Sequence, residues 1–438
     1  MLTTYTTYKD SGIEWIEGIP SHWDRLPLKQ FGQVTLGKML TSEDKGGYHL
    51  KPYMRSKNIQ VERVDISDVK EMWFSDSELE KLKLKKGDLL FNEGGDVGRT
   101  CIWLKEIDEC YIQNSVNRVR FENDDERYFL HLSTLYHSVG YYDSLVNRVS
   151  IPHLTKEKLE SVLFLRPPLS EQQQIITFLD TKTSLIDSLI EKTQRKIELL
   201  KEKRTSLINE VVTKGLNPNV EMKDSGVEWI GKIPIHWEFL RLNNLGDFSK
   251  GKGITKDKIK ESGNKCIRCG EIYTTYELRF DETNSFIDDE TSSESILGFK
   301  GVLLFTGDGE SLEEIGKCVV YEGEEELYIG GGINVFTPKQ EKVIPIYLSY
   351  VMSSESIIFQ KSRQGKGEIV VHIYSKQLKE IRLGLPPYSE QQQIVEYLDE
   401  QTQLIDKTIS IEEKRIELLK EYRQSLISEV VTGKRKVV

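Results

Sequence analysis

The sequence PPLSEQQQIITFLDTKTSLIDSLIEKTQRKIELLKEKRTSLINEVVTKG at residues 167–215 decides the fold, because it occurs twice. It recurs without a gap at residues 386–434 as PPYSEQQQIVEYLDEQTQLIDKTISIEEKRIELLKEYRQSLISEVVTGK, and 29 of the 49 positions are identical. The two prolines at the start of each copy end any preceding strand, and Ser170 and Ser389 are good helix N-caps. The repeat therefore predicts the same long helix at two places in the chain.

Both copies carry a coiled-coil seam, in which positions recur at alternating spacings of four and three residues. Thr193 and Arg204 interrupt the first seam at the same registers at which Glu412 and Arg423 interrupt the second. Matched interruptions favour two helices that pair with each other over two amphipathic helices that each pack on their own domain. The residues predicted to form the helix-pairing seam are Ile186, Ile190, Ile197, Leu200, Leu207, Val211, Ile405, Ile409, Ile416, Leu419, Leu426 and Val430.

The connection between the helices predicts their orientation. The first helix leaves one domain and leads the chain into a second domain, and the second helix leaves that second domain. If the two helices pair in register, they must therefore run antiparallel. A helix of about 35–45 residues would place the two domains roughly 50–65 Å apart.

A second repeat precedes each variable region. The sequence KDSGIEWIEGIPSHW at residues 9–23 recurs as KDSGVEWIGKIPIHW at residues 223–237. Between these anchors the similarity is faint, although His153 corresponds to His372. The chain is thus a duplication of a domain with its helix, in which constant ends do the same work twice and divergent middles do related but different work. The predicted boundaries are 1–165 for the first box and domain, 166–215 for the central helix, 216–384 for the second box and domain, and 385–438 for the distal helix and basic tail.

Short apolar runs separated by glycine, aspartate and asparagine dominate both middles, with few amphipathic helices. This pattern is typical of a mixed domain of about 140–150 residues. The predicted fold class is therefore α+β, with two tandem domains separated by two long helices that form an antiparallel coiled coil.

Loops in the middles contain side chains suited to contacting nucleic acid. Arginine suits guanine, asparagine and glutamine suit adenine, and lysine suits phosphate. An exposed loop arginine is nevertheless more often a solvated charge, and the formal net charge of -10 counts mildly against a nucleic-acid binder unless the basic footprint is local. The candidate DNA-binding residues are Arg55, Lys57, Asn58, Gln113, Asn114, Arg268 and Glu271.

Enzyme motifs are nearly absent. Residues 305–309 fit the F-x-G-x-G pattern of an S-adenosylmethionine loop, and residues 385–388 read LPPY. Leu385 stands where an amino-methyltransferase needs a polar acceptor, so that enzyme class is a remote alternative. Cys266 and Cys269 form a C-x-x-C with no second pair, which does not make a zinc site. We therefore predict no catalytic residue and no metal site.

Two repeated sequences together resemble the markers of the specificity subunit of Type I restriction–modification systems. They are the box at residues 9–23 and 223–237 and the PPxSEQ start of each long helix, and the resemblance extends over essentially the whole chain. Gly87-Asp88 fits the family's turn, whereas Val302 replaces the aspartate in the second copy. The resemblance implies two target-recognition domains that each read one half of a bipartite sequence in double-stranded DNA, with the helices as spacer. A non-DNA coiled-coil scaffold or adaptor is the competing interpretation.

The resemblance also implies a subunit without catalytic activity. Two methyltransferase subunits that modify adenine with S-adenosylmethionine would bind it, and restriction subunits that use ATP and Mg²⁺ would join them. No cofactor is expected in this chain. The sequence has no run of about 18 apolar residues and no apolar N-terminal segment, so no contact with a membrane and a cytoplasmic location are expected.

Overall fold

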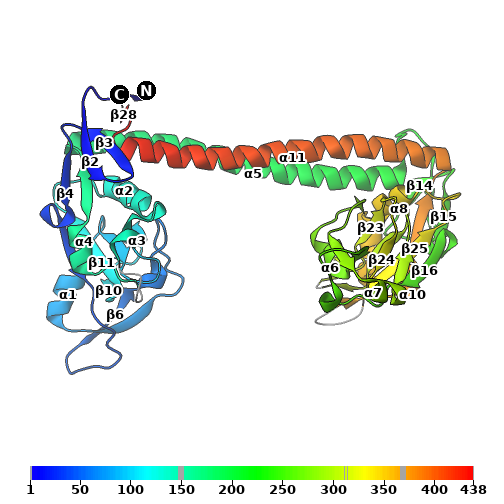
Figure 1. Ribbon diagram of the computed structural model, residues 1–438, viewed down its shortest axis with the longest axis horizontal. Coiled ribbons are helices and arrows are strands. Elements are labelled where there is room, and N and C mark those ends of the chain that lie inside the picture. Colours follow the sequence, from blue (N-terminus) through cyan, green and yellow to red (C-terminus); the bar gives the residue numbers. More distant parts are fainter. Residues whose placement is uncertain (1, 147–151, 310, 313, 366–370, 438) are drawn as a thin grey trace. The chain divides into compact units, whose positions relative to one another are not determined.

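The computed structural model describes residues 2–146, 152–309, 311–312, 314–365 and 371–437. Two compact units divide the chain. Unit 1 contains residues 1–193 and 414–438, and unit 2 contains residues 194–413. The helices α5 (Leu169–Lys214) and α11 (Tyr388–Val431) each contribute a part to both units (Figure 1).

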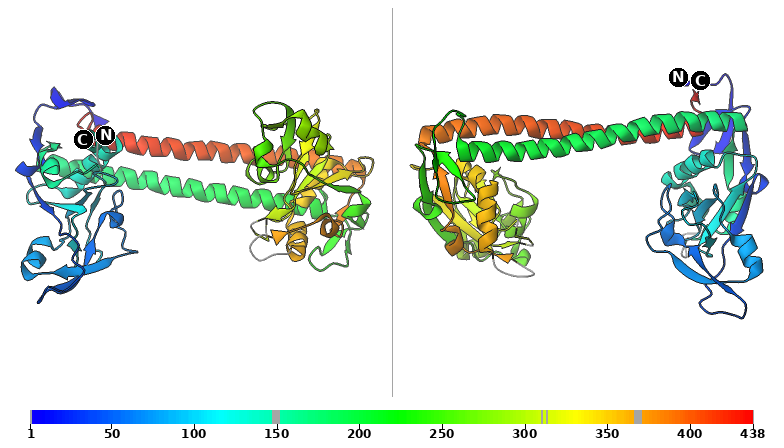
Figure 2. Two further views of the ribbon diagram at one scale, coloured as in Figure 1. Left: turned by 60° about the horizontal axis from the view of Figure 1, so that its bottom comes forward. Right: turned by 180° about the vertical axis from the view of Figure 1, so that it is seen from behind.

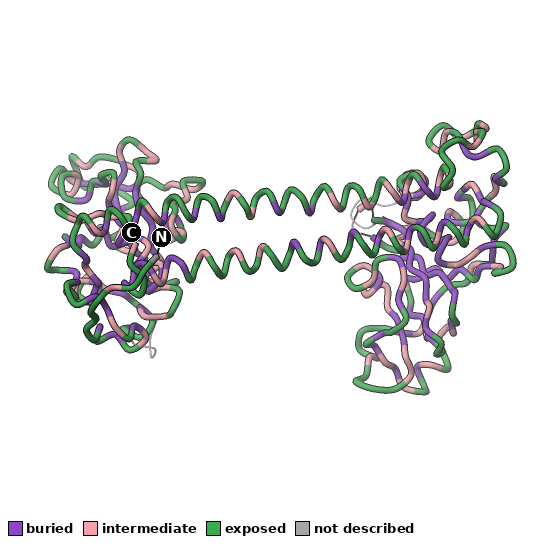
Figure 3. Tube along the Cα trace, turned by 90° about the horizontal axis from the view of Figure 1, so that it is seen from above, coloured by how far each residue is buried: buried purple, intermediate pink, exposed green. Residues whose placement is uncertain are grey.

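The two long helices run antiparallel in each unit, as the sequence predicts. Unit 1 combines the first part of α5 with the last part of α11, and unit 2 combines the last part of α5 with the first part of α11. Figure 2 shows the two helices side by side. All twelve residues of the predicted seam are buried or half-buried. Buried positions recur along both helices between exposed ones (Figure 3).

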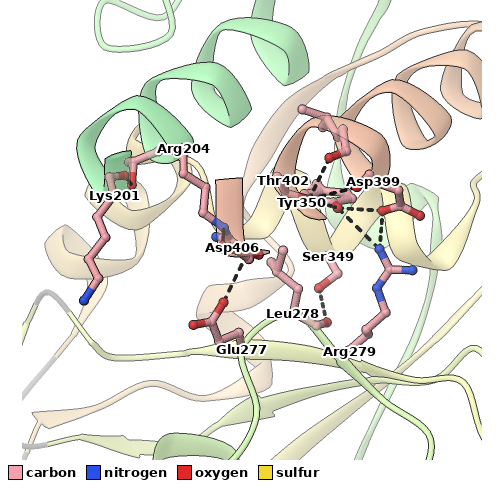
Figure 4. Close-up of polar contacts among 12 residues, drawn as sticks. Lys201, Arg204, Glu277, Leu278, Arg279, Ser349, Tyr350, Asp399, Thr402 and Asp406 are labelled. Carbon is pink, nitrogen blue, oxygen red and sulfur yellow. Dashed lines mark hydrogen bonds and ion pairs between the residues drawn. The ribbon is translucent and has the colours of Figure 1, made fainter. Parts of the chain in front are cut away.

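A polar seam residue joins the helices to the domain in unit 2. Arg204 Nε of α5 lies 2.9 Å from Asp406 Oδ1 of α11. Arg204 Nη2 also donates a hydrogen bond of 3.1 Å to Glu277 Oε2 of the domain (Figure 4). Nearby, Arg279 forms an ion pair with Asp399 of α11. One arginine thus contacts its partner helix and its domain together.

The same arrangement recurs in unit 1. Arg423 Nε of α11 lies 3.1 Å from Asp187 Oδ1 of α5, and Arg423 Nη2 lies 3.8 Å from Glu62 Oε2. Arg127 of the domain pairs with Asp180 of α5 at 2.9 Å. The two arginines that interrupt the seam therefore have specific partners, and this fixes the register of the helices.

In unit 1 a four-stranded sheet in the order β5-β11-β8-β9 and a three-stranded sheet in the order β10-β6-β7 form the domain. The end of α11 packs into the larger of two cores, where Leu426 and Val430 meet Trp23. The elements are β1 (Leu2–Thr3), β2 (Tyr8–Ile13), β3 (Ile16–Pro20), β4 (Asp24–Pro27), β5 (Gly32–Leu36), β6 (His49–Met54), β7 (Lys70–Phe74), α1 (Asp76–Leu82), β8 (Leu89–Asn92), β9 (Thr100–Ile102), β10 (Tyr111–Ile112), β11 (Val116–Phe121), α2 (Glu126–Ser138), α3 (Tyr141–Leu145), α4 (Lys156–Ser161), β12 (Leu163–Arg166) and β28 (Lys436–Val437).

In unit 2 the corresponding sheets have the orders β16-β25-β21-β23-β18 and β19-β17-β24-β20. The end of α5 packs into the larger core, where Val211 and Val212 meet Trp237. The elements are β13 (Met222–Asp224), β14 (Lys232–Pro234), β15 (Glu238–Arg241), β16 (Gly246–Lys250), β17 (Asn264–Ile267), α6 (Cys269–Thr274), β18 (Arg279–Phe280), β19 (Ser285–Ile287), α7 (Asp289–Glu294), β20 (Ile296–Gly298), β21 (Leu303–Thr306), β22 (Asp308–Gly309), β23 (Cys318–Tyr321), β24 (Leu327–Ile329), β25 (Ile333–Pro338), α8 (Pro345–Met352), α9 (Glu355–Gln364), β26 (Val371–His372), α10 (Ser375–Leu378) and β27 (Arg382–Leu385).

Within each unit, the box contacts the start of the long helix that follows its domain. His22 Nε2 of the first box lies 2.8 Å from Glu171 Oε2 at the start of α5. His236 Nε2 lies 2.7 Å from Glu390 Oε2 at the start of α11, and Trp237 Nε1 donates a hydrogen bond to Glu390 Oε1. The two repeated sequences lie about 150 residues apart in the chain but contact each other in the fold. The same joint therefore forms in both units, which explains why both sequences are repeated.

A buried glutamine anchors each long helix to its domain. The Gln172 amide accepts a hydrogen bond from Asp125 N and donates to Asp124 Oδ1 at 2.7 Å. The Gln391 amide accepts from Ile344 N and donates to Lys342 O at 3.0 Å. Both the oxygen and the nitrogen of each buried amide thus have a hydrogen-bond partner.

The chain ends meet in unit 1. The strand β1 pairs antiparallel with β28, with Leu2 opposite Val437 and Thr3 opposite Lys436. Figure 1 shows the N- and C-terminal ends beside each other.

Candidate nucleic-acid interface

Two of the predicted loops come together in the first domain. The strand β10 pairs parallel with β6, so that Ile112 lies opposite Met54 and both strands end at the same edge. Ser56 N donates a hydrogen bond of 3.0 Å to Ser115 Oγ. Residues 55–58 and 113–115, far apart in sequence, therefore form one surface.

The second domain is built in the same way. The strand β24 pairs parallel with β17, with Ile329 opposite Ile267. Gly330 N donates to Ile267 O at 2.9 Å, as Gln113 N donates to Met54 O at 3.0 Å. Arg268 consequently occupies the position of Arg55, and the glycines 330–332 occupy that of residues 113–115.

Further segments join the same surface in both domains. Lys38 N donates to Ile112 O, and Lys252 N donates to Ile329 O, both at 3.1 Å. His153 and His372 also belong to this surface. The backbone N–H of the residue after His153 donates a hydrogen bond to the turn that follows β8, and the N–H of the residue after His372 donates to the turn that follows β21. We name this surface the loop face. It comprises residues 37–38, 55–58, 93–95, 113–115 and 153–154 in the first domain, and 251–252, 268–271, 307–309, 330–332 and 372–373 in the second.

Sequence reasoning missed Lys38 and Lys252 of the loop face, and it noted His153 and His372 only as a matching pair. The recurring Gly-Lys pairs at residues 37–38 and 251–252 were the available signal. They are too short to align without the strands. Lys38 is also occupied, since its Nζ lies 2.6 Å from Glu78 Oε2.

The predicted residues of the segment 55–58 differ in their exposure. Arg55 is half-buried and Lys57 is exposed, and both contact the carboxylate of Asp68. Asn58 is only 1% exposed. Its amide accepts from Arg55 N at 3.1 Å and donates to Asp65 O at 2.8 Å. Asn58 as placed thus holds the loop, and its amide is taken up by the backbone.

Gln113 and Asn114 are half-buried on the loop face. Gln113 Nε2 donates to Asn114 Oδ1 at 2.5 Å, and Gln113 Oε1 accepts from Ser115 N at 3.2 Å. The two amides are therefore adjacent and oriented by their neighbours, which suits a surface that reads hydrogen-bonding groups.

In the second domain, Arg268 is half-buried and its Nε lies 3.5 Å from Glu271 Oε2. Glu271 also accepts from Arg268 N at 2.8 Å and from the hydroxyl of Ser285. Its carboxylate is thus directed toward Arg268. On the same face, His372 Nδ1 lies 2.6 Å from Asp308 Oδ1.

The described residues offer no group of three or more histidine, cysteine, aspartate or glutamate side chains that could hold a metal ion. Cys266 is buried in β17, and burial raises the pKa of its thiol to about 12. Leu385 is buried at the end of β27. The described part of the chain also contains no helix long and apolar enough to cross a membrane.

The chain matches a family model described as the type I restriction modification DNA specificity domain, over residues 20–199 and 234–421. It is 24% identical to the MjaVIII specificity subunit of a type I restriction enzyme from Methanocaldococcus jannaschii, over 98% of this chain and 97% of that protein. It is 25% identical to the EcoBI specificity subunit from Escherichia coli, over 72% of this chain and 66% of that protein.

Two solved structures share the fold. One comes from a study of complex assembly and conformational transition in the type I R-M system, with a TM-score of 0.71, 16% identity and coverage of 95% of this chain and 99% of that one. The other is the HsdS subunit from Thermoanaerobacter tengcongensis, with a TM-score of 0.57, 16% identity and coverage of 95% and 98%.

Proposed function

We propose that this chain, which belongs to the type I restriction–modification DNA specificity family, recognises a bipartite DNA target by reading one half-site with the loop face of each domain. The observation that carries the proposal is that the two loop faces share one backbone construction but differ in side chains. Gln113-Asn114-Ser115 in one face corresponds to three glycines in the other. Equal construction with different hydrogen-bonding groups is what two different half-sites require.

Arg55→Ala and Arg268→Ala test this proposal. If these arginines read bases, each substitution weakens specific binding by about 1–3 kcal/mol and relaxes one position of one half-site. The measurement is methylome sequencing of the host with each variant, together with binding to target and non-target duplexes. Arg363→Ala is the control, because this arginine of α9 is not part of the loop face and lies over the rings of Trp229 and Phe359. A uniform loss across all sequences would assign the arginines to phosphate contacts instead.

We further propose that the chain is non-catalytic and directs two copies of an adenine methyltransferase subunit. These subunits would bring S-adenosylmethionine, and restriction subunits would bring ATP and Mg²⁺. Exposed leucines on the long helices support the binding of two copies of the methyltransferase subunit. The exposed fraction is 57% for Leu185 and 53% for Leu418 in unit 1, and 48% for Leu199 and 61% for Leu404 in unit 2.

Within each unit, the two leucines occupy the same flank of the coil. Each immediately precedes a seam residue, as Leu185 precedes Ile186. The domain instead contacts the flank that follows the seam, because its Arg127 pairs with Asp180, which lies one heptad before Asp187. Successive helical residues differ by about 100°, so the two flanks lie on opposite sides of the seam. The two helices of an antiparallel pair are related by a twofold axis. The flank before the seam on one helix therefore lies on the same side of the pair as the flank before the seam on the other helix. Each unit therefore offers an equivalent apolar surface, away from its domain, for one copy of the same partner.

The partner surface has a direct test. In the double variant Leu199→Asp and Leu404→Asp, the apolar surface of unit 2 becomes charged, and we expect a complex that retains one methyltransferase subunit and loses the other. Native mass spectrometry of the complex measures this ratio. Gln403→Asp adds one such charge beside Leu404 at an exposed position without removing a leucine, and it should leave two subunits bound. Two subunits bound to the double variant would refute this surface.

A further inference from the structure

One carboxylate beside the loop face of the first domain gathers three cations. Asp68 Oδ2 lies 2.7 Å from Arg55 Nη2 and 2.8 Å from Lys57 Nζ, and Asp68 Oδ1 lies 3.2 Å from Lys70 Nζ. The hydrogen bonds from Lys57 and Lys70 lower the pKa of Asp68 to about 2. The aspartate is therefore anionic at neutral pH, and the cluster of four side chains keeps a net positive charge.

Asp68 restricts how Arg55 is presented. Arg55 Nε is buried and has no hydrogen-bond partner, and Nη2 contacts Asp68. This leaves the terminal edge of the guanidinium as the part that can contact a ligand. Two parallel N–H groups on such an edge match O6 and N7 of guanine. Without Asp68, repulsion among the three cations would favour other side-chain positions.

The second domain holds its equivalent arginine by another acid. Glu271 lies beside the guanidinium of Arg268 and also accepts from Arg268 N, while its side chain is only 17% exposed. In the first domain these two tasks are divided, since Asn58 accepts from Arg55 N and Asp68 contacts the guanidinium. Acids from different sequence positions thus serve the equivalent arginine in both domains.

We infer that Asp68 and Glu271 are positioning residues that orient Arg55 and Arg268 and thereby set the sharpness of base discrimination in each half-site. The inference rests on the proposed reading of DNA by the loop faces. A bidentate arginine discriminates between bases only if its two N–H groups are held toward the base edge. The carboxylate also offsets cations that would otherwise attract phosphate regardless of sequence.

The test is Asp68→Asn in the full chain, assembled with the methyltransferase subunit of its host. We expect binding to a random-sequence duplex to rise several-fold, because three cations lose their anion. We expect the ratio of target to random binding to fall about tenfold, within the range that one bidentate contact provides. Methylome sequencing should show one relaxed position in one half-site. Glu271→Gln should relax the other half-site.

Three further variants make the result specific. Asp108→Asn removes the same charge at a highly exposed residue paired only with Lys105 among the ion pairs described, and should change neither quantity. Asp68→Glu keeps the carboxylate and should restore most of the discrimination. Once Arg55→Ala is present, Asp68→Asn should relax no further position of the methylated motif, as expected for residues that act through one another, although Lys57 and Lys70 still raise binding to the random-sequence duplex.

Two outcomes would overturn the inference. Discrimination by Asp68→Asn equal to that by Asp108→Asn would show that the carboxylate does not position the arginine. A further relaxed position of the methylated motif in the double variant with Arg55→Ala would show the same. The second half-site, which Asp68 does not touch, reports in each experiment whether the variant is folded and assembled. If the unaltered complex bound no target specifically, the proposed function itself would fail.

Discussion

A fragment of residues 1–220, produced without the rest of the chain, is expected to form a twofold-symmetric dimer. With the methyltransferase subunit present, the dimer should methylate a palindromic sequence made of the first half-site and its inverted repeat. The reason lies in the core of unit 1, which is completed by the end of α11. The residues that α11 supplies there are Leu426, Ile427, Val430 and Val431, and α5 carries the same residue types at the equivalent positions Leu207, Ile208, Val211 and Val212.

The polar contacts are also preserved in such a dimer. In the full chain, Arg423 of α11 pairs with Asp187 of α5. The residue of α5 equivalent to Arg423 is Arg204, so in the dimer Arg204 of each copy would meet Asp187 of the other. The pair would form twice, and closed twofold symmetry is the common solution for a self-complementary surface.

Sedimentation measures the dimer, and methylome sequencing measures the motif. Arg204→Asp should weaken the fragment dimer, because two ion pairs become repulsive, and the further change Asp187→Arg should restore it. A soluble and folded monomer would contradict the pairing argument. A dimer that methylates the original asymmetric motif would contradict the assignment of one half-site to one domain.

Replacing residues 24–165 by residues 238–384 of the same chain should give a protein with two copies of the second domain. We expect it to methylate a palindrome of the second half-site and its inverted repeat, whereas the first half-site disappears entirely. The internal donor suits the joints that remain. Its Ile344 N and Lys342 O would meet Gln172 as they meet Gln391, and its Glu277 would approach Arg423 as it approaches Arg204.

The matched control is the reciprocal exchange, in which residues 24–165 replace residues 238–384, so that the first domain occupies both positions. It should methylate the same palindrome as the fragment dimer, which links the two experiments. Retention of any part of the first half-site in the exchanged protein would show that recognition is not confined to residues 24–165. Loss of all methylation with an intact complex would show that the joints are not interchangeable.

The long helices were predictable because their signal is local. The spacing of Ile186, Ile190 and Ile197 indicates a seam directly, and the duplication indicates its partner. The matched interruptions at Arg204 and Arg423 indicated a fixed register. Their partners Asp187 and Asp406 lie one residue after a seam position, on the flank that meets the domain, and heptad spacing alone does not identify them.

The loop face was predictable only in part, because it depends on long-range strand pairing. The candidates Arg55 and Gln113 were chosen for their chemistry, and their proximity follows from the parallel pairing of β6 with β10, for which the sequence has no local signal. The burial of Asn58 has the same origin, because its amide is occupied by a backbone that folds back over it. Asp68 was overlooked because one acid in a polar stretch that also contains Asp65, Lys70 and Glu71 reads as a solvated charge.

The pairing of β1 with β28 gives the polypeptide the topology of a ring with one break. The chain runs through box, domain and helix twice, and the end of the second helix leads back to the start of the first box. The peptide from Gly215 to Glu221 bridges one helix to the next box, and the break between Val437 and Leu2 is its counterpart. A gene that cut the ring at residue 216 and joined residues 437 and 2 by a short linker would encode the same ring. The order in which a genome writes the two half-site readers is therefore free to change while the DNA sequence they select stays the same.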